Sequence, residues 1–221
     1  MLFDFKKTER NLYQPKTTPS IIDVPEMIFL AVEDKGDPNI SEAYKTALEV
    51  LYGLSYSIKM SKRLVAFAPN GYFEYVVPPL EGLWWPLSGG VVNYSDKDNL
   101  CWISMIRQPG FVTPVVLSEA QKALAKKKLG IDLSKVRLMK MAEGLCVQVM
   151  HAGPYDNEPA TVAAMEQYAL ENGYAIDLTD TRRHHEIYLS DPRKVAPEKL
   201  KTIIRHPVKG YSSEPSLVLP A

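Results

Sequence analysis

The segment 184–189 carries three side chains that could do chemistry together on one face of a strand. Side chains alternate along a β-strand, so His184, Glu186 and Tyr188 would share one face while the residues between them point the other way. A carboxylate buried in an otherwise apolar strand needs a partner, or it keeps its proton with a raised pKa. Such a glutamate can serve as a general acid or base, or anchor a cationic ligand. The alternative is a surface strand whose polar residues face water, and the segment alone leaves both open.

The composition departs from ordinary globular usage only in its aromatic residues, with 12 Tyr and 3 Trp. Trp84 and Trp85 stand side by side in the segment 80–86, which its Gly and Pro residues predict to be a loop. A loop does not easily bury two indoles, so this pair indicates a stacking wall for a ligand. Aromatic walls suit planar or cationic molecules, and Tyr155 and Tyr72 are further candidates for them.

The charge balance and the cysteines exclude several classes of function. Lys+Arg and Asp+Glu both number 26, and this zero net charge argues against nucleic acid as a partner. Cys101 and Cys146 are isolated, as expected for buried thiols in a reducing, cytoplasmic compartment. No apolar stretch approaches the roughly 20 residues that a membrane span needs. His151, His184 and His185 match no metal-ligand spacing, so neither a metal nor a cofactor is expected.

The pattern of elements predicts an α+β fold with two similar halves. Hydrophobic periodicity and turn signals predict three helices, one after the cap residue Asn39 and two near 118–129 and 159–171. The strands are expected at residues 27–32, 64–68, 72–77, 100–107, 145–151, 184–189 and 202–208.

Strand, helix, strand, strand therefore occurs twice, at about 27–107 and 145–208. We expect antiparallel sheets and two halves related by a pseudo-twofold axis, with a ligand cleft between them. The predicted organisation is an N-terminal arm at 1–24, a single ligand-binding domain at 25–208 and a C-terminal tail at 209–221.

Three segments together resemble a known family: 79–85 (PLEGLWW), 148–155 (QVMHAGPY) and 184–192 (HHEIYLSDP), of which the last is the most specific. They are similar to stand-alone GyrI-like small-molecule-binding proteins, and the resemblance extends from about residue 25 to residue 208. It implies the two-repeat effector-binding module that multidrug-responsive regulators carry behind a DNA-binding domain. Those relatives hold flat, often cationic drugs beside a glutamate in an aromatic pocket, and Glu186 occupies the matching position. No helix-turn-helix pattern precedes the module here, so a transcription-factor role is not expected.

The resemblance also implies an activity, because some stand-alone members hydrolyse cyclopropanoid genotoxins, in which a strained cyclopropane is fused to a dienone. On this basis Glu186 is expected to activate water, with Tyr72 or Tyr188 at the dienone oxygen. Trp84, Trp85 and Tyr155 would hold the planar ring system, and Glu81 and His184 would complete the ligand site. The alternatives are a drug-sequestering module without chemistry, and an interaction protein such as a gyrase inhibitor, which the zero net charge does not favour.

Overall fold

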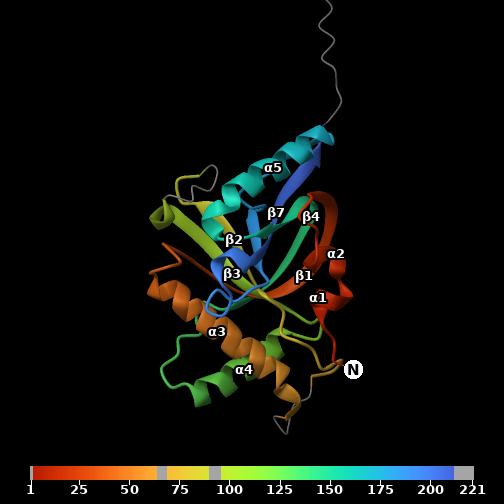
Figure 1. Ribbon diagram of the computed structural model, residues 1–221. Helices are drawn as coiled ribbons and strands as arrows, with labels where there is room; N and C mark the ends of the chain where they lie inside the picture. The colour runs from red at the N-terminus through yellow and green to blue at the C-terminus, as the bar shows by residue number, and fades with distance from the viewer. Residues whose placement is uncertain (1, 64–68, 90–95, 212–221) are drawn as a thin grey trace, which may run out of the picture.

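A closed antiparallel barrel forms the centre of the computed structural model, which describes residues 2–63, 69–89 and 96–211 (Figure 1). Within these ranges the barrel strands follow the order β4-β1-β3-β2-β6-β7, and β7 pairs with β4 to close the ring. A short β5 (Tyr174–Ile176) extends the sheet beside β7. The barrel strands are β1 (Ser20–Lys35), β2 (Leu80–Pro86), β3 (Leu100–Gln108), β4 (Arg137–Ala152), β6 (His184–Tyr188) and β7 (Lys201–Gly210).

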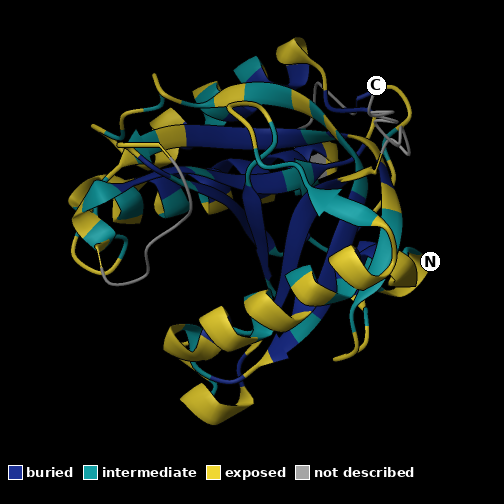
Figure 2. Cartoon of the chain, turned by 90° about the horizontal axis from the view of Figure 1, so that it is seen from above, coloured by how far each residue is buried: buried dark blue, intermediate teal, exposed yellow. Residues whose placement is uncertain are grey.

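The longer helices lie outside the barrel, with α3 over β1 and β3 and α5 over β4 (Figures 1 and 2). Helix α3 begins after Ser41, whose side chain accepts a hydrogen bond from the Tyr44 amide, so the cap lies two residues beyond the predicted Asn39. The α-helices are α1 (Phe5–Thr8), α2 (Arg10–Tyr13), α3 (Glu42–Lys59), α4 (Pro114–Lys127) and α5 (Glu158–Glu171). The 3₁₀ turns are η1 (Ser61–Arg63), η2 (Lys97–Asn99), η3 (Tyr155–Asn157) and η4 (Pro197–Lys199).

The predicted α+β class and antiparallel pairing are confirmed, whereas two local predictions are wrong. Segment 80–86 is strand β2, not a loop, because its apolar side chains are buried between β3 and β6. Segment 72–77 forms only an isolated bridge between Tyr75 and Phe3 instead of a strand. The strand predicted at 64–68 lies outside the described residues. The pairing also unites all the barrel strands in one closed sheet, where separate sheets were expected.

The inside of the barrel holds a charged network of largely buried side chains. His185 on β6 donates from Nδ1 to Glu143 Oε1 (2.9 Å) and from Nε2 to Glu81 Oε2 (3.1 Å), which requires an imidazolium with both nitrogens protonated. Arg205 pairs with the other Glu143 oxygen at 2.8 Å, so two acids balance two bases. The link from β2 to β4 spans the barrel, because these strands are not neighbours in the sheet. Gly144, the residue after Glu143, has a φ of +64°, which is in the left-handed region that favours glycine.

The short helices α1 and α2 lie against this network. The Tyr13 hydroxyl donates to Glu81 at 3.2 Å, and Arg205 donates to the Leu12 carbonyl at 3.1 Å. Tyr13 and Leu12 are themselves buried. The N-terminal segment therefore contributes directly to the core of the barrel. Strand β1 already begins at Ser20, within the segment that the sequence analysis assigned to the arm.

The His185 imidazolium makes the stability of the fold depend on pH. Burial alone would lower the pKa of His185, but Glu143 and Glu81 outweigh it and raise the pKa from 6.5 to about 9. Its contribution is therefore fully present below pH 6.5 and is lost as the pH rises through about 9. We expect urea unfolding to show a loss of roughly 3 kcal/mol from this group across that window.

The matched variant is His185→Gln, which should be less stable at pH 6 and should lose this part of the pH dependence. A variant whose stability parallels that of the wild type between pH 6 and pH 9.5 would show that His185 is not charged in the folded state.

Candidate functional site

A cluster of polar and aromatic side chains lies on the outer face of the barrel, where β6 pairs with β2. His184, Glu186 and Tyr188 share this face, as the alternation along the strand predicted. Gly82 of β2 lies directly opposite Glu186, and Trp84 lies opposite His184. The site is thus built on paired strands of the barrel, which hold its side chains in register.

The Glu186 carboxylate is buried and receives a hydrogen bond at each oxygen. His184 Nε2 lies 2.9 Å from Oε1, and the Tyr188 hydroxyl donates to Oε2 at 2.7 Å. Trp84 Nε1 in turn donates to the Tyr188 hydroxyl at 3.0 Å. Only 8% of Glu186 is exposed, so these neighbours replace the water that would otherwise solvate its charge.

Glu158, at the start of α5, brings a second carboxyl group against Glu186. It is 1% exposed, and neither of its oxygens completes a hydrogen bond to the part of the chain that the structure describes. The Glu186 carboxylate and the Thr202 hydroxyl lie close enough to influence its protonation. Two carboxyl groups this close avoid their repulsion when one of them keeps a proton.

The two carboxyl groups have pKa values shifted in opposite directions. Burial, followed by the charge of Glu186, raises the pKa of Glu158 to about 10. Burial would also raise the pKa of Glu186, but the hydrogen bonds from His184 and Tyr188 help to lower it instead. At neutral pH the pair therefore comprises a neutral acid, Glu158, beside an ionised base, Glu186. This is the division of roles that acid–base catalysis uses.

Aromatic rings surround the carboxyl pair. The Tyr155 ring lies edge-on to Tyr188 at 5.9 Å, and the Tyr44 ring lies 6.0 Å from Trp84. Tyr44 comes from the first turn of α3, and Tyr155 comes from η3 just before α5. Burial, followed by the charges of Glu158 and Glu186, raises the pKa of Tyr155 to about 12, so its phenol stays neutral. The cluster therefore combines flat apolar surfaces with one buried negative charge.

Gly82 makes room for this arrangement. A Cβ atom added at this position would lie 2.7 Å from Trp84 Nε1 and 3.2 Å from the Tyr188 hydroxyl oxygen. The bare backbone of Gly82 thus allows the indole and the phenol to meet in front of Glu186.

Three of the residues expected at the site lie elsewhere in this structure. Trp85 points to the opposite face of β2 from Trp84, because adjacent strand residues alternate, and the Arg183 guanidinium covers its ring at 4.5 Å. Glu81 also faces away from Glu186, into the barrel, where it pairs with His185. The Tyr72 hydroxyl donates to the Lys59 carbonyl at the end of α3, at 2.5 Å.

Four of the expected residues lie around Glu186: Trp84, Tyr155, His184 and Tyr188. The structure adds Glu158 and Tyr44, which the sequence analysis did not identify as site residues. The sequence analysis did not single out Glu158 because acidic residues are common at the start of a helix. The spacing of Tyr44 within α3 indicated only a buried helix face.

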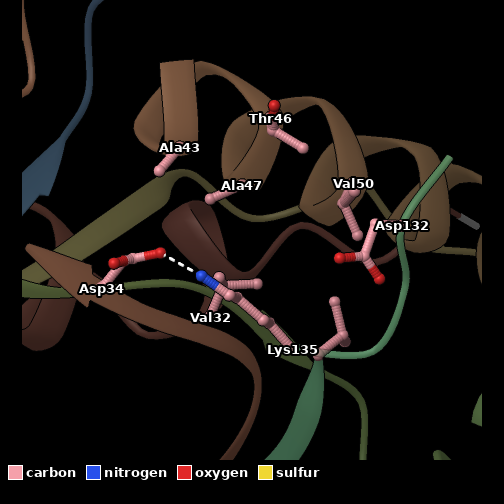
Figure 3. A pocket seen from close by; sticks show the side chains of 9 residues that line it. Val32, Asp34, Ala43, Thr46, Ala47, Val50, Asp132 and Lys135 are labelled. Atoms are coloured by element: carbon pink, nitrogen blue, oxygen red, sulfur yellow. Dashed lines mark hydrogen bonds and ion pairs between the residues drawn. The ribbon is translucent and has the colours of Figure 1, made fainter. Parts of the chain in front are cut away.

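Both glutamates of the carboxyl pair are buried in this conformation. A cavity of about 210 Å³ lies instead between β1 and α3, where Val32, Ala47 and Val50 form part of its wall beside the ion pair of Asp34 and Lys135 (Figure 3). Its lining shares no residue with the carboxyl cluster. A ligand that reaches Glu186 must therefore displace one of the covering side chains.

Neither a metal centre nor a membrane span is found in the described parts of the chain. Within residues 2–63, 69–89 and 96–211, no three His, Cys, Asp or Glu side chains are grouped to hold a metal ion. Across the same ranges, every helix is too short or too polar to cross a bilayer.

Proteins of known structure share this fold. The sequence model of the GyrI-like small molecule binding domain family matches residues 17–209. A solved structure from Listeria innocua, described as an uncharacterized conserved protein, is 49% identical, covers 94% of this chain and all of its own, and has a TM-score of 0.88. A structure described as a hydrolase from the same organism is 48% identical over the same shares, with a TM-score of 0.85.

A more distant structure, the C-terminal domain of EcmrR, shares the fold at 14% identity and a TM-score of 0.50, covering 87% of this chain and 98% of its own. No curated protein matches the chain. The chain belongs to the GyrI-like small molecule binding family.

The buried acid at Glu158 should cost the fold stability. Unfolded glutamate releases its proton near pH 4.5, whereas the folded protein keeps this proton to about pH 10, so stability falls as the pH rises above 4.5. We expect Glu158→Gln to raise the free energy of unfolding at pH 8 by about 4 kcal/mol relative to its effect at pH 5. Urea unfolding at both pH values tests this, with the exposed Glu171→Gln as control. An equal effect at the two pH values contradicts a protonated Glu158.

Gly82→Ala should disturb the site more than the fold. The added methyl group must displace the Trp84 indole, so we expect affinity for the planar aromatic cation ethidium to fall by about tenfold or more. Fluorescence titration measures this. Gly110→Ala is the matched control, because a Cβ atom there meets nothing within 4 Å. Equal affinities for the two variants would place the ligand elsewhere.

Proposed function

We propose that the chain binds planar aromatic small molecules at Glu186 and hydrolyses cyclopropanoid genotoxins there, as a detoxifying enzyme of the cytoplasm. The observation that carries this proposal is the carboxyl pair, with an ionised Glu186 beside a neutral Glu158 in aromatic surroundings. The hydrolase from Listeria innocua, at 48% identity, supports an enzymatic role. The free, buried Cys101 and Cys146 fit a reducing compartment.

The aromatic rings favour a flat ligand. Trp84, Tyr44 and Tyr155 offer ring faces and edges near the carboxylate, and such surfaces bind planar systems through stacking and edge contacts. A cationic ligand would gain further from the charge of Glu186. The zero net charge of the chain, in contrast, offers no attraction for nucleic acid.

The carboxyl pair suits hydration of a cyclopropane fused to a dienone. Glu186 takes a proton from water while the water oxygen bonds to a cyclopropane carbon. The ring C–C bond breaks, its electron pair moves into the dienone, and the dienone oxygen becomes a phenolate. That oxygen takes the proton of Glu158 and becomes a phenol. The elements of water have then been added overall, with the hydroxyl group on the former cyclopropane carbon and a proton on the phenol oxygen, and the pair returns to its starting state when Glu158 regains a proton and Glu186 loses one.

Tyr188 takes a positioning role in this scheme. Its hydroxyl holds one oxygen of Glu186 and accepts the Trp84 indole N–H, so it fixes the carboxylate against the ring that would stack on the ligand. Burial, followed by the Glu186 charge, raises the pKa of Tyr188 well above its ordinary value, so the hydroxyl stays a donor. Tyr72 would need a different conformation to take part.

We also infer that the two halves of the chain are related by a pseudo-twofold axis, with the ligand site between them inside a binding unit at 25–208. Support comes from the order of elements: β1, α3, β2, β3 is followed, after α4, by β4, α5, β6, β7, with the short β5 as an addition between α5 and β6. The first turns of the two corresponding helices, α3 and α5, supply Tyr44 and Glu158 to the same cluster.

Substitution of Glu186 tests the proposed chemistry. With a synthetic cyclopropane-fused dienone that carries a planar aromatic arm, we expect Glu186→Gln to lower kcat by roughly 10²–10⁴. Affinity for this neutral compound should change little, because the amide keeps the size of the carboxylate. Liquid chromatography of the ring-opened phenol gives the rate, and Glu171→Gln serves as the control. Recovery of the intact compound after long incubation with the wild type would leave only a binding module.

A further inference from the structure

A continuous line of hydrogen bonds leads from Glu186 away from the ligand side. His184 contacts Glu186 Oε1 through Nε2 at 2.9 Å, and its Nδ1 lies 2.6 Å from Nε2 of His206 on β7. His206 Nδ1 lies 2.9 Å from Oε1 of Glu166 on α5. Both imidazoles are almost fully buried, whereas a third of the Glu166 side chain is exposed. The line therefore connects the buried carboxylate with solvent.

The number of protons in this line follows from its geometry. Each of the three contacts needs one proton, because two facing lone pairs or two facing N–H groups repel. Two neutral imidazoles bring only two protons, so the four groups must hold a third. It can reside on Glu186 or on Glu166, with both imidazoles neutral, or on either histidine as an imidazolium, with both carboxylates ionised. Each move between neighbouring groups takes one proton hop along a hydrogen bond that already exists.

We propose that His184, His206 and Glu166 form a proton relay between Glu186 and solvent. When Glu186 carries the third proton and both imidazoles are neutral, that proton passes to Nε2 of His184, while the Nδ1 proton of His184 passes to Nε2 of His206. The Nδ1 proton of His206 then passes to Glu166, which releases it to water, and both rings return to their starting tautomers before the next proton enters. The reverse sequence carries a proton inward, and each hop breaks and forms one N–H or O–H bond.

The relay rests on the proposed function only for its role in turnover. A flat ligand over Glu186 would separate that carboxylate from water on its own side, so a proton taken from the attacking water needs another exit. Burial lowers the pKa of His206, so it holds the third proton weakly, as a relay member should. Among the described residues, further titratable groups face the line at its inner end: Tyr188 on β6, Glu158 on α5, Tyr155 on η3 and Tyr44 on α3.

Nuclear magnetic resonance tests the relay without any substrate. In protein labelled with ¹⁵N-histidine, we expect a hydrogen-bonded proton shared between His184 and His206. The titration of His206 should move down by about one pH unit or more in Glu166→Gln, because the amide cannot stabilise an imidazolium as a carboxylate does. Glu171→Gln, on the same helix, should leave the titration unchanged. Absence of the shared proton, or equal titrations in Glu166→Gln and the wild type, overturns the relay whether or not the protein is an enzyme.

Turnover of the cyclopropane-fused dienone gives the second readout. Glu166→Gln should complete one fast turnover and then slow, with kcat about tenfold lower and the first-turnover rate retained, since only the proton exit is blocked. Glu166→Asp keeps a proton acceptor and should restore kcat. An unchanged kcat in Glu166→Gln, alongside loss of activity in Glu186→Gln, overturns the relay and leaves the proposed function standing. Loss of the first turnover together with kcat would mean that Glu166 acts through structure alone.

Discussion

Two buried carboxyl groups that lie side by side cannot both be ionised without a large electrostatic cost, and this constraint governs the arrangement around Glu186. His184 and Tyr188 place their donors on Glu186, which fixes the negative charge there. Glu158 has neither of its oxygens bonded to a described residue and keeps the proton. The fold holds a base and an acid in contact at neutral pH, and both are buried away from the water that would otherwise solvate their charges.

The barrel makes this possible by separating two kinds of charge. Its interior contains a neutral network of Glu81, Glu143, His185 and Arg205, in which each charge has a fixed partner. Its outer face contains the Glu186 cluster, in which Glu158 is left without a complete set of partners. Adjacent residues of β6, His185 and Glu186, belong to these two environments because side chains alternate along a strand. The inner network stabilises the structure, while the buried, protonated Glu158 of the outer cluster costs stability.

The local sequence pattern predicted the helices and strands of this protein better than it predicted the contacts between them. The helices near α3, α4 and α5, and the face shared by His184, Glu186 and Tyr188, follow from periodicity and were predicted from it. Strand β2 was missed because a short apolar segment with Gly82 and Pro86 has no clear period, and its burial depends on β3 and β6 on either side. The opposite orientations of Trp84 and Trp85 follow from that strand and could not be known without it. Glu158 reaches Glu186 only through closure of the barrel, which no local signal reports.

Infrared spectroscopy of the carboxyl groups tests the central claim most directly, because a neutral carboxylic acid and a carboxylate absorb at different frequencies. Protein equilibrated at pH 7 should show the band of a buried, protonated carboxyl group, and this band should shift in heavy water and be missing from Glu158→Gln. It should persist in the wild type until the pH approaches about 10. A spectrum at pH 7 with no protonated carboxyl band, or one that Glu158→Gln leaves unchanged, would contradict a neutral Glu158 beside an ionised Glu186.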